Sequence, residues 1–282
     1  MNLNMPELPE VEAVRRLISR TLVGAPLTDV FVAEDSLVFP RQRAAELVEV
    51  LAGACLRSVG RKGKYFWLDF GSVSLLGHLG MSGWVRSLGT GEKRLISHGK
   101  APLDNEAGEP KFLKMSLTAG DSRVVFTDGR RLARYWLTPD GAVDPAVAKL
   151  GPDMLDSPYS AESLGVVLAT RSAPIKSLLL DQALFAGVGN WVADEVLYHA
   201  GIAPARPAKE ISKHEVAALA DSLREVVRLA VEAEADDSKY PSEWLFHVRW
   251  GGRHGAETHL GHAIERTTVG GRTAAWVPAK QV

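Results

Sequence analysis

The sequence predicts an α+β protein, with a strand-rich N-terminal half followed by a helical C-terminal half. Short β-prone runs punctuated by glycine fill most of the chain between Val30 and Thr127. Apolar residues at helical spacing dominate from Ala161 to Ala233, where the β character has disappeared. Between these regions, residues 139–158 collect Pro and Gly without periodicity, which is typical of a linker. A length of 282 residues agrees with more than one domain, because single cores seldom grow beyond roughly 250 to 300 residues.

The N-terminal half is expected to open with a helix and to continue as strands. Pro9 suits the first turn of a helix, and apolar residues recur at helical spacing until Gly24 ends the run. A second helix is expected from about Arg41 to Leu51. The turn at 119–121 indicates a β-hairpin inside an all-β domain. Strands are expected near residues 30–39, 56–70, 73–79, 84–88, 111–117 and 122–127.

The C-terminal half is expected to be helical up to a strand-rich tail at 240–282. Ser212 as N-cap and Glu215 three places later form a capping box for the longest helix. The chain is expected to leave a helix at Gly187, to turn, and to enter the next helix with Asn190 as N-cap. The expected helices run roughly over 161–169, 174–184, 191–200 and 212–233.

Composition excludes several classes of protein. The lone Cys55 forbids an intramolecular disulfide and a zinc site built from two Cys pairs. No run approaches the roughly 18 to 20 apolar residues that a bilayer span needs. The first residues lack the basic and apolar regions of a signal peptide. We therefore expect a soluble, intracellular protein without membrane contact.

The charges are segregated along the chain, although 33 Lys+Arg nearly balance 34 Asp+Glu. One basic cluster lies at residues 57–64 and a second at 123–134, whereas acids collect at 232–237. A single face can therefore hold a polyanion such as nucleic acid. Solvated strand ends are the alternative interpretation of the same clusters.

The turn at 187–190 has the features of an anion site. Its two glycines let the backbone approach a ligand, and a new helix start points N–H groups outward. Asn190 can add a side-chain amide and Lys176 a charge. The alternative is an ordinary helical hairpin whose glycines only serve the turn. A dinucleotide site is not expected, because no strand precedes Gly187.

Several motifs follow one another along the chain. With them the sequence resembles the formamidopyrimidine-DNA glycosylase and endonuclease VIII family (Fpg/Nei) of DNA repair enzymes, from Met5 nearly to Val282. It is most similar to the plant and fungal type, which has a zincless finger. The motifs are Pro6-Glu7-Leu8-Pro9-Glu10-Val11-Glu12, Gly63-Lys64-Tyr65, His78-Leu79-Gly80-Met81-Ser82-Gly83, Thr127-Asp128-Gly129-Arg130-Arg131, Leu180-Asp181-Gln182 with Gly187-Val188-Gly189-Asn190, and Gly271-Arg272-Thr273.

The resemblance implies a β-sandwich domain, a helical domain with a helix-two-turn-helix (H2TH) element, and a terminal β-hairpin finger. The corresponding boundaries are 6–138 for the N-terminal β-sandwich catalytic domain, 139–158 for the linker, 159–240 for the H2TH DNA-binding domain and 241–282 for the finger. Residues 276–280 stand where zinc-containing relatives have a Cys pair, so the finger is expected to hold without metal. The spacing of His247, His254, His259 and His262 fits no standard ligand set. We expect neither a metal nor a cofactor.

The resemblance implies a bifunctional DNA glycosylase and abasic-site (AP) lyase of base excision repair, acting on oxidised bases in duplex DNA. Pro6 is the implied nucleophile, which attacks the sugar carbon, forms a Schiff base and cuts the strand by β/δ-elimination. Glu7 is the implied acid that protonates the sugar ring oxygen, and Glu10 helps to position the site. Lys64 is implied to contact the phosphate next to the lesion.

The remaining implied DNA contacts form two sets. The phosphate set is Lys176, Gly189, Asn190 and Arg272. The set that fills the void left by the extruded base is Met81, Arg130 and Leu132. Leu132 stands where the formamidopyrimidine branch has an aromatic residue, which leaves the opposite-base preference open. The span 234–241 is shorter than the loop that caps 8-oxoguanine in that branch, so ring-opened purines, hydantoins and oxidised pyrimidines are comparably expected substrates.

Amine chemistry supports Pro6 as the nucleophile. An α-amino group has a reference pKa of roughly 7.7 to 8.0, against about 10.4 for Lys, and the positive helix end lowers it further. The amine exists only if Pro6 is the first residue, so we expect translation to start at Met5 or processing to remove the preceding residues. If Pro6 stays blocked, the alternative function is a catalytically silent damaged-DNA binding protein. Structurally, the alternative is that Pro6 and Pro9 merely start a helix.

The implied partner is double-stranded DNA that contains oxidised bases or abasic sites, bound by a monomer. The implied location is the cytoplasm (nucleoid) of a bacterium or the nucleus of a eukaryote.

Overall fold

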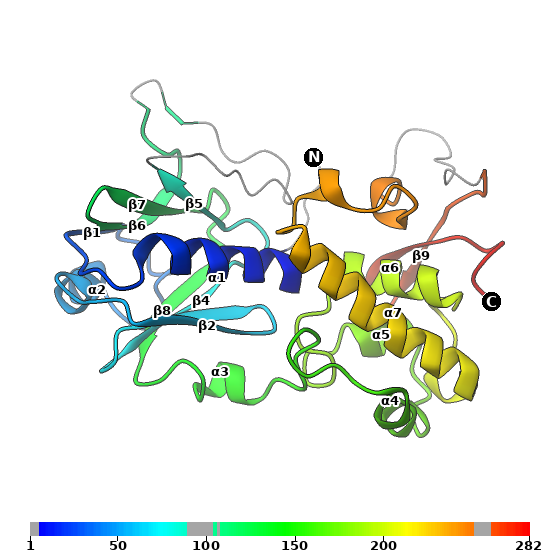
Figure 1. The fold of residues 1–282 in the computed structure, drawn as a ribbon. Coiled ribbons are helices and arrows are strands. Elements are labelled where there is room, and N and C mark those ends of the chain that lie inside the picture. Colours follow the sequence, from blue (N-terminus) through cyan, green and yellow to red (C-terminus); the bar gives the residue numbers. More distant parts are fainter. Residues whose placement is uncertain (1–5, 89–103, 106–107, 251–260) are drawn as a thin grey trace. The chain divides into compact units, whose positions relative to one another are not determined.

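The computed structural model describes residues 6–88, 104–105, 108–250 and 261–282 of the chain, which form two compact units (Figure 1). The first unit runs to Lys149 and also takes in Glu234–Asp237. The second comprises Leu150–Ala233 and Ser238–Val282. The mixture of helices with antiparallel sheets confirms the predicted α+β class.

The first unit contains two antiparallel sheets of four strands each. One has the order β1-β6-β7-β5 and the other the order β2-β3-β4-β8. The strands of the first sheet are β1 (Asp29–Val32), β6 (Leu113–Ala119), β7 (Ser122–Thr127) and β5 (Trp84–Leu88). Those of the second are β2 (Ser58–Lys62), β3 (Tyr65–Asp69), β4 (Ser74–His78) and β8 (Arg134–Thr138).

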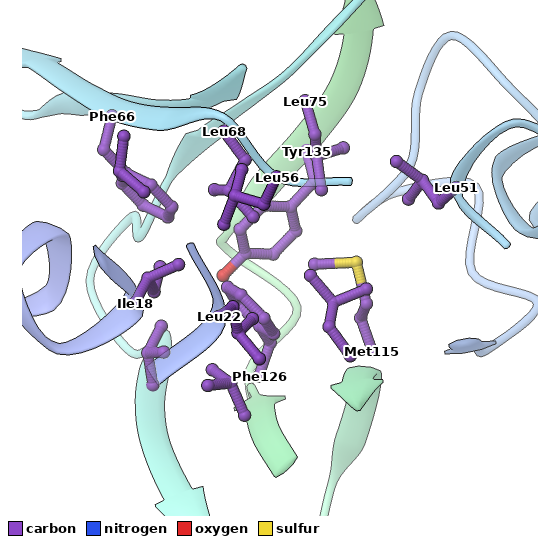
Figure 2. Close-up of a cluster of buried hydrophobic side chains, with 14 of the residues drawn as sticks. Ile18, Leu22, Leu51, Leu56, Phe66, Leu68, Leu75, Met115, Phe126 and Tyr135 are labelled. Carbon is purple, nitrogen blue, oxygen red and sulfur yellow. The ribbon is translucent and has the colours of Figure 1, made fainter. Parts of the chain in front are cut away.

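A single apolar core joins both sheets to the two helices α1 (Leu8–Leu22) and α2 (Ala44–Leu51). Figure 2 shows Phe66 from one sheet and Phe126 from the other on either side of Tyr135, with Ile18 and Leu22 of α1 beside them. The Tyr135 ring lies 5.5 Å from that of Phe126 and 6.4 Å from that of Phe66, centroid to centroid, both in edge-on geometry. These side chains are essentially unexposed, so their burial dominates the stability of this unit.

Three elements of the first unit differ from the sequence prediction. Strand β1 ends at Val32, well before Phe39, because the Asp35 carboxylate accepts the backbone N–H groups of Leu37 and Val38 and turns the chain there. Strand β8 was not predicted, although it pairs with β4 along its whole length. A short helix, α3 (Pro145–Ala148), lies in the stretch predicted as a linker and is capped by Asp144.

The second unit is built on four helices and a β-hairpin. The helices are α4 (Ala161–Leu168), α5 (Ile175–Leu179), α6 (Asn190–Ala200) and α7 (Lys213–Glu232). The hairpin, called the finger below, consists of β9 (Glu265–Val269) and β10 (Arg272–Trp276). Short 3-10 helices are η1 (Ala208–Glu210), η2 (Asp237–Lys239) and η3 (Leu245–His247). The predicted capping box of α7 is confirmed, since the Glu215 carboxylate accepts the Ser212 N–H and the Ser212 hydroxyl accepts the Glu215 N–H.

Helix α5 is shorter than predicted, because side chains in the following segment stabilise turns in place of helix. The Asp181 carboxylate accepts the Ala183 N–H, and the Gln182 amide donates to the carbonyls of Leu180 and Val188. Helix α6 starts one residue earlier than predicted, with extended Gly189 as N-cap and Asn190 as the first helical residue. No helix in the described part of the chain combines the length and the apolar character needed to cross a membrane.

Candidate active site and nucleic-acid interface

Pro6 and Glu7 lie directly before α1, and the structure buries them together with Glu10. Glu7 is the N-cap, with an extended backbone, and Pro9 occupies the first turn as expected. The Glu10 carboxylate accepts the Glu7 N–H at 2.9 Å. This bond fixes the peptide that joins Pro6 to Glu7, so Glu10 orients the residue that precedes it by one helical turn. Two carboxyl groups and a proline therefore meet at the positive end of a helix.

Two residues after Glu10, Glu12 is the centre of an ion-pair cluster that the sequence analysis did not identify. Its carboxylate accepts from Arg15, Arg16 and Arg61 at 2.8 to 3.1 Å. Burial alone would raise the pKa of Glu12, but the hydrogen bonds and charges of these arginines bring it below its ordinary value. The local pairs follow the i,i+3 and i,i+4 spacing of a helix, whereas the pair with Arg61 has no signal in the sequence.

Arg61 connects α1 to the turn that carries Lys64. Its side chain is only 2% exposed, and besides Glu12 it donates to the Gly63 carbonyl at 3.3 Å. Gly63 turns the chain between β2 and β3 with a φ of 57°, and Lys64 follows it with 8% of its surface exposed. The structure therefore ties the segment of Lys64 to the helix that begins after Pro6 and Glu7.

Met81, Arg130 and Leu132 lie on two turns that contact each other. The Ser82 hydroxyl donates to the Asp128 carboxylate at 2.6 Å, which joins the turn after β4 to the turn after β7. Gly80 has a φ of 60°, and a Cβ there would lie 2.3 Å from the Leu132 carbonyl oxygen. Only glycine allows this approach.

Asp128 also shapes the second turn from within. Although 1% exposed, it accepts the backbone N–H groups of Arg130, Leu132 and Ala133 at 2.7 to 3.0 Å. Residues 130–133 therefore turn around the Asp128 carboxylate. In this turn Arg130 is exposed and Leu132 is half-buried.

The two adjacent arginines of this turn have different environments. Arg131 has a φ of 57° and makes a bidentate pair with Asp35, with N–O distances of 2.9 to 3.1 Å. Burial alone would raise the pKa of Asp35, but the hydrogen bonds from Arg131 and Lys114 hold it well below its usual range. In the part of the chain that the structure describes, Arg130 is held by its backbone N–H alone, and no ion pair or hydrogen bond involves its guanidinium. Of these two neighbours, Arg131 is therefore anchored and Arg130 faces outward.

His78 ends β4 next to the turn that carries Met81. Its Nδ1 lies 3.0 Å from the Gly80 nitrogen and accepts that N–H, and its ring packs on Tyr65 at 4.8 Å between centroids. Burial, helped by the charges of Lys64 and Arg134, lowers the pKa of His78 to about 4. The imidazole is therefore neutral at physiological pH, which is the form that can accept the Gly80 N–H.

The candidate anion site of the second unit lies at the start of α6. The Gln182 side-chain oxygen accepts the Gly187 N–H at 3.1 Å, and its amide donates to the Val188 carbonyl at 2.8 Å, so this side chain closes the turn. The chain then enters α6, whose first N–H groups have no acceptor within the helix. The Asn190 Oδ1 is buried without a hydrogen-bond partner in the described part of the protein. The Asn190 side-chain amide, which has N–H donors as well as this oxygen, lies at the start of α6, where the anion site is expected.

The structure corrects the expectation that Lys176 supplies a charge to this site. The Lys176 side chain is wholly buried, and its ammonium donates to Asp194 at 2.5 Å and to the Thr273 carbonyl at 2.7 Å. A cation enclosed in this way has no surface from which to reach a phosphate. Lys176 belongs to the interior of the second unit.

Arg272 opens β10 directly after the turn of the finger. Gly270 and Gly271 have φ values of 57° and 73°, as a two-residue hairpin turn requires. Arg272 pairs with Val269 across the hairpin and is exposed. Within the described residues no ion pair involves its guanidinium. Among those residues no group of three or more His, Cys, Asp or Glu side chains is placed to hold a metal, and His254 and His259 lie outside them.

Known proteins match the chain along nearly its whole length. Residues 5–135 match the family description "Formamidopyrimidine-DNA glycosylase N-terminal domain", and residues 150–249 match "Formamidopyrimidine-DNA glycosylase H2TH domain". Formamidopyrimidine-DNA glycosylase of Arabidopsis thaliana is 37% identical over 279 residues, which cover 98% of this chain and 71% of that protein. The enzyme of the same name from Geobacter metallireducens is 34% identical over 283 residues, covering 98% of this chain and all of that one.

Solved structures give the same result for the fold. The Lactococcus lactis formamidopyrimidine-DNA glycosylase, bound to DNA containing an AP site, superposes with a TM-score of 0.79 at 25% identity, covering 98% of this chain and 99% of that one. MutM in complex with DNA containing carbocyclic 8-oxo-G gives a TM-score of 0.80 at 25% identity, covering 98% and 100%. With both family domains in order and relatives above 30% identity along nearly its whole length, the chain belongs to the formamidopyrimidine-DNA glycosylase family of DNA repair enzymes, as its motifs predicted.

Proposed function

We propose that the chain is a bifunctional DNA glycosylase and AP lyase that works through a Schiff base on Pro6. The observation that best supports this proposal is the buried cluster before α1. There Glu10 accepts the Glu7 N–H and so fixes the Pro6–Glu7 peptide, with the carboxyl group of Glu7 next to the proline. A neutral secondary amine at Pro6 attacks C1′ of the damaged nucleotide while Glu7 protonates the ring oxygen of the sugar. The base leaves with the electron pair of the glycosidic bond, and the amine nitrogen, now bonded to C1′, loses its proton. The nitrogen lone pair then expels the protonated ring oxygen from C1′, which opens the sugar and forms the iminium.

Strand cleavage follows from the charge of that iminium. The iminium withdraws electrons from the adjacent C2′–H bond, so a base removes that proton and the 3′ phosphate leaves by β-elimination. A second elimination expels the 5′ phosphate, and hydrolysis of the Schiff base releases Pro6 unchanged. These reaction steps need no metal and no redox partner. It does require that Pro6 be the first residue of the active protein, because an amide nitrogen cannot form an iminium.

The proposed DNA contacts use both units. Lys64, Gly189, Asn190 and Arg272 are proposed to contact phosphates. The position of Asn190 at the start of α6 and the exposed guanidinium of Arg272 support this assignment. Met81, Arg130 and Leu132 fill the space of the extruded base, supported by their adjacency on two joined turns. Lys176 is removed from the phosphate set by its burial.

The proposed substrates are duplexes that carry an abasic site or an oxidised base, the classes named for the Lactococcus lactis and MutM complexes. Ring-opened purines, hydantoins and oxidised pyrimidines stand beside 8-oxoguanine, and a panel of duplexes with one lesion each ranks them. We propose that the protein acts as a monomer in the compartment that holds the genome, the nucleoid of a bacterium or the nucleus of a eukaryote.

Borohydride trapping tests the proposal. The chain is prepared with a cleavable leader that ends directly before Pro6, and the same protein is examined before and after cleavage with a duplex that contains an abasic site. We expect a covalent adduct after cleavage only, with the cross-link mapped to Pro6 by mass spectrometry. An adduct in the uncleaved protein, or one mapped to a lysine, contradicts the proposal. Tight binding without any adduct after cleavage identifies instead the catalytically silent damaged-DNA binding protein.

A further inference from the structure

Helix α6 carries two adjacent buried acids that the proposed reaction does not use. Asp194 is 1% exposed and Glu195 is unexposed. Asp194 is paired with two cations, the ammonium of Lys176 from α5 and the guanidinium of Arg249. All four residues belong to the second unit.

The cluster around Asp194 holds the finger through its backbone. The Asp194 carboxylate accepts the Ala275 N–H of β10 at 3.0 Å, and Lys176 donates to the Thr273 carbonyl at 2.7 Å. Arg249 extends the cluster, since its own carbonyl accepts from Arg266 of β9 at 3.2 and 3.3 Å. Both strands of the finger are therefore bonded to one ionic centre.

The turn of the finger adds a steric contact with the same helix that carries Lys176. A Cβ on Gly270 would lie 2.4 Å from the Ser177 hydroxyl oxygen and 3.1 Å from its Cβ. The turn thus lies directly on α5, beside the ammonium that bonds β10. The finger cannot shift along α5 without breaking this contact and the bond to Thr273.

Glu195 fastens the segment that precedes the finger. Its carboxylate accepts the N–H groups of Leu245 and Phe246 at 3.0 and 2.7 Å. Around it, Tyr198 of α6 shares a small apolar cluster with Ala275 and Val277. The apolar cluster alone is small, so the polar bonds set the register of the finger on α6.

The ion cluster around Asp194 is also bonded to the segments that carry the two proposed phosphate contacts, Arg272 and Asn190. Arg272 is the residue before Thr273, whose carbonyl is bonded to Lys176. Asn190 lies one helical turn before Asp194, and its carbonyl accepts from Arg249 at 3.3 Å. One carboxylate therefore fixes the segments from which both side chains project.

We propose that Asp194 is a positioning residue that, with Lys176 and Arg249, anchors the finger and holds Arg272 in register with the start of α6. The proposal rests on the proposed function, because it takes Arg272 and Asn190 as phosphate contacts. Asp194→Asn keeps the shape of the side chain but leaves two buried cations without their anion, which the interior does not tolerate. The finger must then detach or rearrange.

Binding to an intact duplex tests this positioning role independently of the Schiff base. We expect Asp194→Asn to weaken binding about tenfold and to lower the salt slope by about one phosphate, as Arg272→Ala does. In the double variant the two effects are expected to coincide and not to multiply, because a displaced Arg272 contributes nothing that can be lost. If Arg272→Ala still weakens binding by its full factor in the Asp194→Asn background, Asp194 does not position Arg272.

Two further variants keep the test decisive. Asp221→Asn on the exposed face of α7, where the acid contacts only Arg224 among the described residues, is the matched control and is expected to bind like the unaltered protein. Lys176→Met preserves the Asp194–Arg249 pair, and it replaces Asp194→Asn in the test if Asp194→Asn does not fold.

Amide hydrogen exchange gives the structural readout. In both Asp194→Asn and Lys176→Met we expect exchange of the 273–276 amides to accelerate at least about tenfold, with α7 unchanged. Unchanged exchange in β10 overturns the proposal. If borohydride trapping fails while these results hold, the proposed reaction is wrong and the anchoring role stands.

Discussion

Replacing Arg61 with Met tests whether one buried ion pair holds α1 to the turn of Lys64. The pair with Glu12 has side chains 2% and 6% exposed, at 3.1 Å. Removing one partner of a buried pair costs about 3–5 kcal/mol. Glu12 keeps Arg15 and Arg16, so the loss falls at the lower end, about 3 kcal/mol, and includes the bond to the Gly63 carbonyl. At roughly 2–4 °C per kcal/mol, Tm falls by about 6–12 °C.

Urea unfolding followed by tryptophan fluorescence measures this loss. Arg43→Met is the matched control, because its pair with Glu46 has an arginine side chain 81% exposed, and solvent-exposed pairs of this kind contribute little to stability. Under conditions where both variants are folded, Arg61→Met is also expected to slow formation of the trapped adduct by on the order of tenfold to a hundredfold, since the Lys64 turn is misplaced. A free energy of unfolding equal to that of Arg43→Met would refute the reasoning.

Four other changes give separate tests. Glu7→Gln is expected to leave binding intact and to abolish base release, while an abasic duplex still yields a borohydride adduct; base release at the normal rate removes Glu7 from the mechanism. Arg272→Ala is expected to weaken binding to damaged and intact duplex alike and to reduce the salt slope by about one. The pKa of His78 falls from 6.5 to about 4 on folding, so the unfolded state takes up its proton first as the pH drops. Between pH 7 and pH 5 this costs about 2 kcal/mol of stability by urea unfolding, a loss that His78→Gln should remove. Gly270→Ala is expected to weaken duplex binding as Asp194→Asn does, because its Cβ would displace the turn from Ser177; normal affinity would place the turn elsewhere.

Features that depend on neighbours in the sequence were predictable. The capping box of Ser212 and Glu215 joins residues three apart, and the apolar spacing of α1 repeats within one helix. The H2TH and β-sandwich parts followed from motifs in their order. Strand β8 was missed because Tyr135, Trp136 and Leu137 are too few to show alternation, and its place at the edge of the second sheet is decided by pairing with β4, far away in the chain.

In the candidate site, too, contacts between residues far apart in the sequence could not be predicted. Sequence reasoning placed Met81, Arg130 and Leu132 together through a resemblance, and the structure shows that Asp128 joins their turns. The choice of Arg130 over Arg131 came from that resemblance alone, because the deciding partner of Arg131, Asp35, lies 96 residues away. Lys176 was assigned to a phosphate for the same reason, since its partner Asp194 is on another helix.

In these cases basic residues pair with buried acids of the same protein and do not face the solvent with their full charge. Arg131, Arg61 and Lys176 each donate to a buried carboxylate, and each lies in or is bonded to a segment that carries a proposed DNA contact. Phosphate binding requires cations on segments with little freedom, because ordering a mobile chain on binding costs free energy. A cation paired internally with an acid supplies that rigidity without adding net charge. The near-zero net charge of the chain is therefore compatible with a polyanion partner, since many of its acids neutralise inward-facing cations and leave a few outward-facing ones unopposed.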